Sequence, residues 1–146
     1  MSRQIVALVL GIVVVIAVPV VWAQDQDFKV VIHVDNPISS VGQEQLARGF
    51  MKEIGMWTTG DPVIPVDQLP ESKARAAFSK EIHGKSAAAV AELWQQRGAG
   101  GATPPVMLAS DQEVLDFVRA NPGAVGYVSA KTELGPGVKE LTVTED

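Results

Sequence analysis

The sequence "FKVVIHVDNPISS", residues 28–40, contains the pattern on which the fold prediction depends. Its first eight residues are rich in β-branched side chains and too few for a stable helix, which is typical of a buried strand. The segment "NPISS" ends that strand. Ser40 and Gln43 then have the spacing of a capping box, so we expect a helix to start near Ser40. A strand followed directly by a helix indicates an α/β domain.

The remainder of the chain repeats this alternation. Further helices are expected to start near Ser72, Ser86 and Ser110, because serine at these positions can cap a helix N-terminus. The segment "AVGYVSA", residues 124–130, predicts a second buried strand, and residues 138–144 alternate as either a strand or a loose tail. Two prolines restrict "PVIPV", residues 62–66, to an edge or short strand. Residues 97–105, "RGAGGATPP", have the composition of a loop.

These patterns predict one α/β domain, with a small mixed sheet flanked by helices and built on residues 30–34 and 125–128. The chain has 146 residues, of which 47% are hydrophobic, enough for a single domain with a substantial core. It contains no cysteine, so no disulfide supports the fold. The core must therefore hold the domain together.

The N-terminal residues have the features of a secretory signal. Arg3 precedes an apolar run over residues 5–21, and Val21-Trp22-Ala23 places small residues before polar Gln24. We expect a signal peptide over residues 1–23 and a mature domain over residues 24–146. The alternative is an uncleaved membrane anchor, because about 18 apolar residues are enough to cross a bilayer. Both alternatives place the domain outside the cytoplasm, as a periplasmic or otherwise extracytoplasmic protein.

Composition and motifs argue against several classes of function. The chain carries 17 acidic and 12 basic residues, for a net charge of −5, and the basic residues are scattered, so nucleic acid is not an expected partner. The sequence contains no HExxH, GxSxG or P-loop motif and no cysteine nucleophile. His33 and His83 do not have the spacing of a metal pair. We therefore expect no enzyme activity, no metal and no cofactor.

Candidate ligand residues lie where strands give way to helices. Asp35 and Asp67 end predicted strands near helix starts, where α/β sheets bind ligands, although aspartates more often stabilise turns there. A helix N-terminus offers unpaired N–H groups to an anion. Ser39, Ser40 and Ser72, at two such starts, are therefore the candidate oxyanion ligands, with helix capping as the alternative role.

Six motifs in order resemble the phosphate ABC transporter substrate-binding protein family, which has the type 2 periplasmic binding protein fold. The resemblance covers roughly residues 30–130, and the motifs are "VDNPISS", an amphipathic helix ending near Trp57, "GDPVIPVD", "AFSKEIHGKSAAAVAELW", "PPVMLASDQEVLDF" and "VRANPGAVGYVSA". The resemblance implies a short member with one lobe, because family members with transport roles have two lobes that close around phosphate. It also implies that Asn36–Ser40 and Asp67–Ser72 share an exposed face. That face is polar if the lobe is an independent domain; if the lobe docks a second subunit, Ile38 and Leu69 anchor the contact.

The family's phosphate motif is incomplete in this chain. Relatives hold phosphate with a Ser-Gly-Thr loop, and the corresponding "DQLPESKAR" matches only its serine, at Ser72. Pro70 removes an N–H donor, and Glu71 adds a negative charge. We therefore expect a non-enzymatic, extracytoplasmic domain that acts through a membrane or envelope protein partner, or in sensing. The alternative is a module that binds phosphate or another small oxyanion weakly, in association with phosphate ABC transport.

Overall fold

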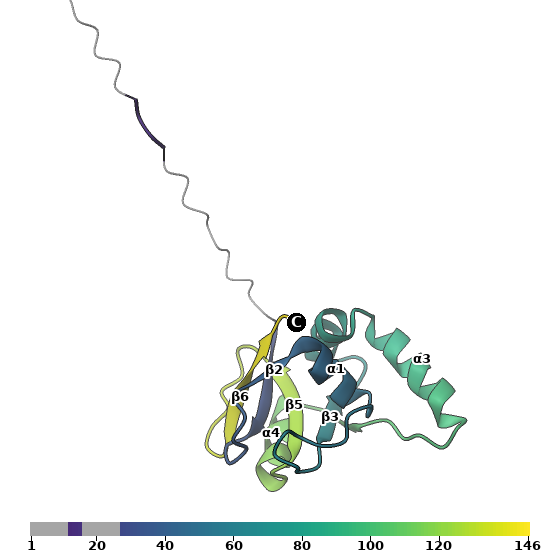
Figure 1. Ribbon diagram of the computed structural model, residues 1–146. Helices are drawn as coiled ribbons and strands as arrows, with labels where there is room; N and C mark the ends of the chain where they lie inside the picture. The colour runs from purple at the N-terminus through teal and green to yellow at the C-terminus, as the bar shows by residue number, and fades with distance from the viewer. Residues whose placement is uncertain (1–11, 16–26) are drawn as a thin grey trace, which may run out of the picture.

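The computed structural model describes residues 12–15 and 27–146, so most of the expected signal peptide lies outside the described residues. Six strands form one mixed sheet in the order β2-β6-β1-β5-β3-β4, which confirms the predicted α/β class (Figure 1). The strands are β1 Phe28–His33, β2 Ser40–Gly42, β3 Ile64–Gln68, β4 Val106–Leu108, β5 Ala124–Ser129 and β6 Val138–Thr144. The helices are α1 Gln43–Phe50, α2 Lys73–Phe78, the π-helix η1 Ser79–His83, α3 Ala87–Gly98 and α4 Asp111–Ala120.

Strand β1 is antiparallel to both of its neighbours, β5 and β6. The other strand pairs are parallel: β2 with β6, and β3 with β5 and β4. The carboxyl ends of all strands except β1 therefore meet at one edge of the sheet, and α1, α2 and α4 begin after β2, β3 and β4 at that edge. Within residues 12–15 and 27–146, no helix is long and apolar enough to cross a bilayer.

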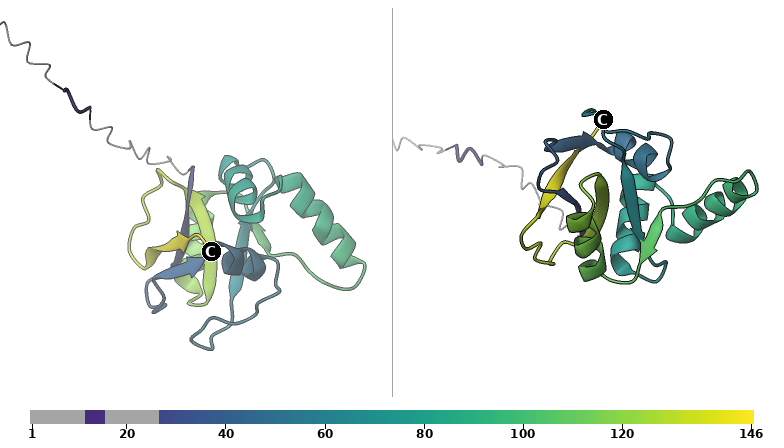
Figure 2. Two further views of the ribbon diagram at one scale, coloured as in Figure 1. Left: turned by 45° about the horizontal axis from the view of Figure 1, so that its top comes forward. Right: turned by 90° about the horizontal axis from the view of Figure 1, so that it is seen from below.

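Helices cover both faces of the sheet (Figures 1 and 2). Side chains of successive strand residues point to opposite faces, so the apolar run of β1 supplies both. Val30 and Ile32 pack with α1, α2 and η1, whereas Val31 packs on the other side with α4. Residues 30–33 and 125–128 of the predicted run are thus the centre of a sheet with two covered faces, whereas Val34 lies beyond the end of β1 and is 48% exposed.

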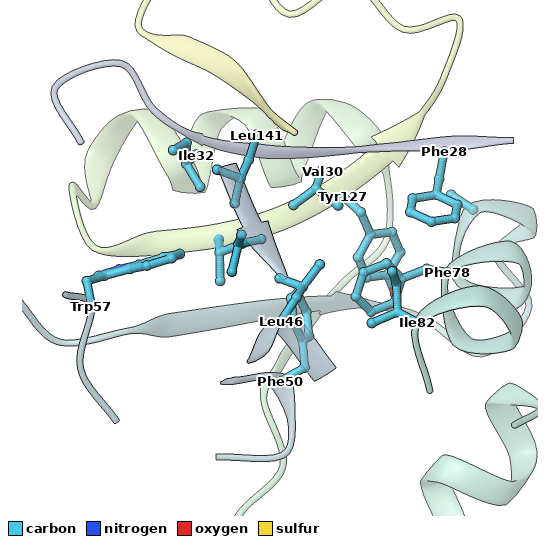
Figure 3. Packing of buried hydrophobic residues seen from close by; sticks show 13 residues of the cluster. Phe28, Val30, Ile32, Leu46, Phe50, Trp57, Phe78, Ile82, Tyr127 and Leu141 are labelled. Carbon is cyan, nitrogen blue, oxygen red and sulfur yellow. The ribbon is translucent and has the colours of Figure 1, made fainter. Parts of the chain in front are cut away.

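An aromatic cluster forms the centre of the larger core (Figure 3). The rings of Phe78 and Tyr127 stack with centroids 4.0 Å apart and an interplanar angle of 9°. Phe28 meets Phe78 edge-on at 5.5 Å, and Phe50 meets it at 4.7 Å. Figure 3 shows Leu46 and Phe50 of α1 facing these rings. The cluster joins α1 and α2 to β5.

The structure confirms three of the four predicted helix starts. The hydroxyls of Ser72, Ser86 and Ser110 accept hydrogen bonds from the N–H groups three residues later. The start at Ser40 was wrong, because Ser40 pairs with Thr142 in the sheet and the cap of α1 is Gly42, which has no side chain. The Asp146 carboxylate instead accepts from the N–H of Glu44 at 2.5 Å.

The expected edge or short strand at residues 62–66 is a short interior strand. β3 runs over Ile64–Gln68, with β5 on one side and β4 on the other. The N–H of Ile64 bonds to Gly123 on the β5 side, so the nitrogen of Pro65 faces the β4 side. Pairing with β4 begins only at Val66, so the absence of an N–H group at Pro65 removes no hydrogen bond from the sheet.

Two parts of the predicted surface also differ. Val106–Leu108, directly after the predicted loop, forms the short edge strand β4. Asn36 is buried, and Ile38 packs against the core, so Ile38 is not an exposed anchor for a second subunit.

Gly126 allows α4 to approach β5 closely. A Cβ at this position would lie 2.7 Å from Cγ1 of Val114, a fully buried side chain. We expect Gly126→Ala to lower the free energy of unfolding by about 1–3 kcal/mol, the usual cost of overpacking, measured by urea denaturation. Gly98→Ala is the control, because nothing lies within 4 Å of a Cβ there. An equal loss in both variants would contradict close packing at Gly126.

His83 gives the core a pH dependence. Burial lowers the pKa of His83; Asp67 raises it, and Lys85 and Arg75 lower it further. An unfolded histidine has a pKa of about 6.5. Below that pH, His83 therefore binds a proton more readily in the unfolded chain than in the folded one. Stability should therefore fall as the pH drops below about 6.5, with a slope from this group of at most about 1.4 kcal/mol per pH unit.

Urea denaturation at several pH values tests this expectation. The unfolding free energy of His83→Gln should decline less between pH 7 and pH 5 than that of the wild type. Parallel declines in the two proteins would show that His83 does not contribute.

Candidate functional site

The candidate site lies at the carboxyl edge of the sheet, where β3 leads into α2. Of the three serines predicted as oxyanion ligands, only Ser72 is there. Ser39 and Ser40 are exposed at the start of β2, on the edge of the sheet. The main-chain carbonyl of Ser39 accepts a hydrogen bond from the N–H of Thr142 in β6.

The three serines do not converge on one point. Strands β6, β1 and β5 separate β2 from β3, which makes four strand spacings. At about 4.8 Å each, these spacings put roughly 19 Å between Ser40 and the end of β3. A hydrogen bond spans about 3 Å, so one small oxyanion cannot bind both Ser40 and Ser72.

The hydroxyl of Ser72 has two partners within the chain. It accepts from the N–H of Arg75 at 3.2 Å, as a helix cap does, and donates to Oε1 of Gln68 at 2.6 Å. The hydroxyl therefore already acts as a donor and as an acceptor within the chain. An incoming anion would have to displace Gln68 to use the Ser72 proton.

Gln68 is the hub of the hydrogen bonds at this edge. Its side-chain amide donates to the carbonyl of Tyr127 and to Oδ1 of Asp111, both at 2.9 Å. Its carbonyl accepts from the guanidinium of Arg75 at 2.8 Å. Because Gln68 is 3% exposed, each of these bonds replaces one that water would otherwise make.

Asp111, in the first turn of α4, supplies an anion at this edge. Its carboxylate also accepts from the N–H of Ser129 at 3.1 Å and from the hydroxyl of Thr132 at 2.6 Å. A backbone amide, a hydroxyl and a side-chain amide are the donors that commonly hold a bound oxyanion. The carboxylate of Asp111 therefore occupies such a set of donors from within the chain.

A buried charge pair lies beneath this network. Asp67 accepts a short hydrogen bond from the hydroxyl of Tyr127, and its carboxylate lies 3.7 Å from Nε of Arg75. Burial raises the pKa of Tyr127 above its usual value, and the Asp67 charge raises it further, so the hydroxyl stays protonated as a donor. In residues 12–15 and 27–146, Nε of Arg75 is the one deeply buried side-chain polar atom without a hydrogen bond.

The sequence singled out Asp67 and Ser72 but missed the other members of the network. Tyr127 carried one usable signal, since a tyrosine in a buried strand needs a partner for its hydroxyl. Arg75 and Asp111 have the pattern of ordinary helix residues, and Gln68 that of a loop residue. Asp35, the other candidate, is exposed, and its N–H bonds to Nδ1 of His33.

The balance of charge at this edge is negative. Residues 67–75 together with Asp111 carry three carboxylates, Asp67, Glu71 and Asp111, against the two cations Lys73 and Arg75. Within the described ranges, no group of three or more histidine, aspartate or glutamate residues could hold a metal ion. The arrangement therefore suits internal hydrogen bonding better than capture of a dianion.

Neither a family model nor a curated protein matches the sequence. Solved structures match its fold. A proposed phosphate ABC transporter substrate-binding protein with bound phosphate, from Clostridium perfringens, superposes with a TM-score of 0.64 at 19% identity, over 80% of this chain and 44% of that one. An ABC-type phosphate transport receptor from Vibrio cholerae gives 0.62 at 19%, over 80% and 46%. PstS from Borrelia burgdorferi gives 0.61 at 14%, over 81% and 47%.

The chain thus spans less than half the length of the proteins that it matches. Identities of 14–19% establish likeness of fold and no more. The match confirms the resemblance drawn from the six motifs: the domain has the fold of about one half of a phosphate-binding protein, consistent with a single lobe.

Proposed function

We propose that this protein is a non-enzymatic, extracytoplasmic domain that acts through a protein partner or in sensing, and that it does not capture phosphate by itself. The observation that carries the proposal is the closed hydrogen-bond network of Ser72, Gln68 and Asp111. In a binding protein of this fold, donors at a strand end would be held ready for a ligand. Here the hydroxyl of Ser72, the side-chain amide of Gln68 and the N–H of Ser129 already have partners in the chain, and Nε of Arg75, which has no hydrogen bond, lies 3.7 Å from the Asp67 carboxylate.

Charge supports the same conclusion. An oxyanion entering at α2 would approach Glu71 and the carboxylates of Asp67 and Asp111, while Arg75 is 3% exposed and lies beside Asp67. Charge-assisted hydrogen bonds contribute about 1.5–3 kcal/mol each, and each 1.4 kcal/mol changes affinity about tenfold. The loss of two such bonds would turn micromolar binding into millimolar binding.

The extracytoplasmic location rests on the sequence alone. The apolar run over residues 5–21 and the small-residue pattern before Gln24 support export, whether or not the segment is cleaved. A partner in the membrane or the envelope follows from that location. Because the donors of Ser72 and Gln68 at the end of β3 are occupied within the chain, we expect the domain to act through contacts of its surface with that partner.

A second function, weak binding of phosphate or another small oxyanion, has one observation in its favour. A structure of the same fold contains bound phosphate. In this chain the binding site would be Ser72 alone, without Ser39 and Ser40, because four strand spacings separate them from it.

Calorimetric titration with phosphate and with sulfate distinguishes the two functions. We expect no saturable binding with a dissociation constant below about 100 µM, in the wild type or in Ser72→Ala. Saturable binding below that value that disappears in Ser72→Ala would contradict the proposal and establish the oxyanion function.

A stability measurement on the same variant tests the internal role of Ser72. Loss of a cap costs about 1 kcal/mol, and Ser72→Ala also removes the bond to buried Gln68. We expect it to lower the free energy of unfolding by about 1–3 kcal/mol.

Ser86→Ala is the matched control, since the Ser86 hydroxyl caps α3 at 3.1 Å in an exposed position. It should cost less than Ser72→Ala. Equal costs would mean that the bond between Ser72 and Gln68 contributes nothing.

A further inference from the structure

Helix α3 stands away from the sheet and leaves a groove between itself and α1. Figures 1 and 2 show α3 extending from the body of the domain, on the side where α1 and η1 lie. The space between α1, the end of η1 and α3 has a volume of about 240 Å³. We call it the α1–α3 groove. None of its lining residues belongs to the network at the end of β3.

The floor of the α1–α3 groove is apolar. Met51 of the turn after α1, Ile82 of η1, and Val90 and Leu93 of α3 line it. Ile82 and Val90 are almost fully buried, so they provide a fixed surface. An apolar floor favours a ligand with a hydrocarbon body, because each apolar group that leaves water lowers the free energy.

The charged side chains of the groove lie at its rim. They are three cations, Arg48, Lys85 and Arg97, and one carboxylate, Glu53. The charge of the rim is thus positive in a chain whose net charge is −5. A cationic rim above an apolar floor is complementary to an amphiphile with an anionic head.

Arg97 is held in place before any ligand arrives. Its guanidinium donates to the carbonyl of Met51 at 2.8 Å and to Oε1 of Glu53 at 2.9 Å. It also lies over the ring of Trp94, 5.3 Å from the centroid. These contacts connect α3 to the end of α1, and they reduce the entropy that Arg97 would lose on binding an anion.

His83 adds a polar group beside the floor. The imidazole lines the groove and meets the rings of Phe50 and Phe78 edge-on. Burial lowers the pKa of His83, so the ring is neutral at pH 7 and can share a hydrogen bond with a carboxylate without a change of charge.

We propose that the α1–α3 groove binds a small amphiphilic carboxylate, with its head at Arg97 and Lys85 and its hydrocarbon body on Met51 and Leu93. One water molecule needs about 10–15 Å³ of such space, so the groove's volume of about 240 Å³ has room for a group much larger than a water. A short chain fits this space, whereas a helix of a partner protein would extend well beyond it. The ligand is a free molecule in solution, and the inference does not depend on the proposed function of the domain.

Titration with octanoate, followed by calorimetry and by tryptophan fluorescence, to which Trp94 beside Arg97 contributes, tests the proposal. We expect one saturable site with a dissociation constant below about 1 mM. Affinity should rise about fourfold per methylene from hexanoate to octanoate, as burial of a CH₂ predicts, and level off when the groove is full. Octylammonium and octanol should bind at least about tenfold more weakly than octanoate, because they lack the charge that the rim recognises.

Two rim variants locate the head group. Lys85→Gln should weaken octanoate binding about threefold, and Arg97→Gln at least about tenfold. Since Arg97→Gln also breaks the bond to Glu53, its folding is checked by circular dichroism, and exposed Lys85 provides a variant that leaves the packing intact. Lys80→Gln is the matched control: it removes an exposed lysine of η1 outside the groove.

Four results would overturn the proposal. The first is octanoate binding that does not saturate. The second is equal affinity for octanoate and octylammonium. The third is equal weakening by Lys85→Gln and Lys80→Gln, which would indicate attraction by general surface charge. Binding of vesicles of phosphatidylcholine with anionic lipid, without binding of free octanoate, would also contradict it and would assign the groove to a membrane surface.

Discussion

The hydroxyl of Tyr127 imposes the constraint on which the rest of the structure depends. The Tyr127 ring is fully buried and stacked on Phe78, so its hydroxyl must find a partner inside the protein. That partner is Asp67, and a carboxylate at this depth in turn requires a positive charge, which Arg75 supplies. Tyr127 therefore links the two: its ring belongs to the aromatic core, and its hydroxyl belongs to the polar network at the strand ends.

The same constraint explains the chemistry of the strand ends. Arg75 is oriented toward Asp67 and the carbonyl of Gln68, and the side chain of Gln68 connects Ser72 to Asp111. Removal of one partner from such a network leaves the others buried and unpaired, at a cost of about 1–3 kcal/mol for a neutral group and more for a charged one. An external anion would have to compete with bonds that the fold already makes. The α1–α3 groove shares no lining residue with this network.

The sequence predicts those helices and strands that are specified by patterns of a few neighbouring residues. The β-branched run of β1 and the serines that cap α2, α3 and α4 carry their signals within a few residues. Strands β2 and β4 have three residues each, and they exist because β6 and β3 provide partners far away in the sequence. The capping box at Ser40 failed for the same reason: pairing with Thr142 holds Ser40 extended, and Asp146, about a hundred residues later, caps α1. At the site, Ser72 was recognisable as a helix cap. Its second bond, to the side chain of Gln68, depends on the tertiary contacts that hold Gln68 in place.

At the carboxyl edge of the sheet, the hydroxyl of Ser72, the side-chain amide of Gln68 and the N–H of Ser129 are already occupied by the chain itself. Backbone amide NMR during titration with phosphate tests this most directly, because the N–H groups of Arg75 and Ser129 report on the Ser72 hydroxyl and on the Asp111 carboxylate. The account predicts that both resonances stay in place up to about 10 mM phosphate, apart from small linear changes with ionic strength. Saturable shifts of these two amides at micromolar phosphate would show that the network opens for a ligand and would contradict the account.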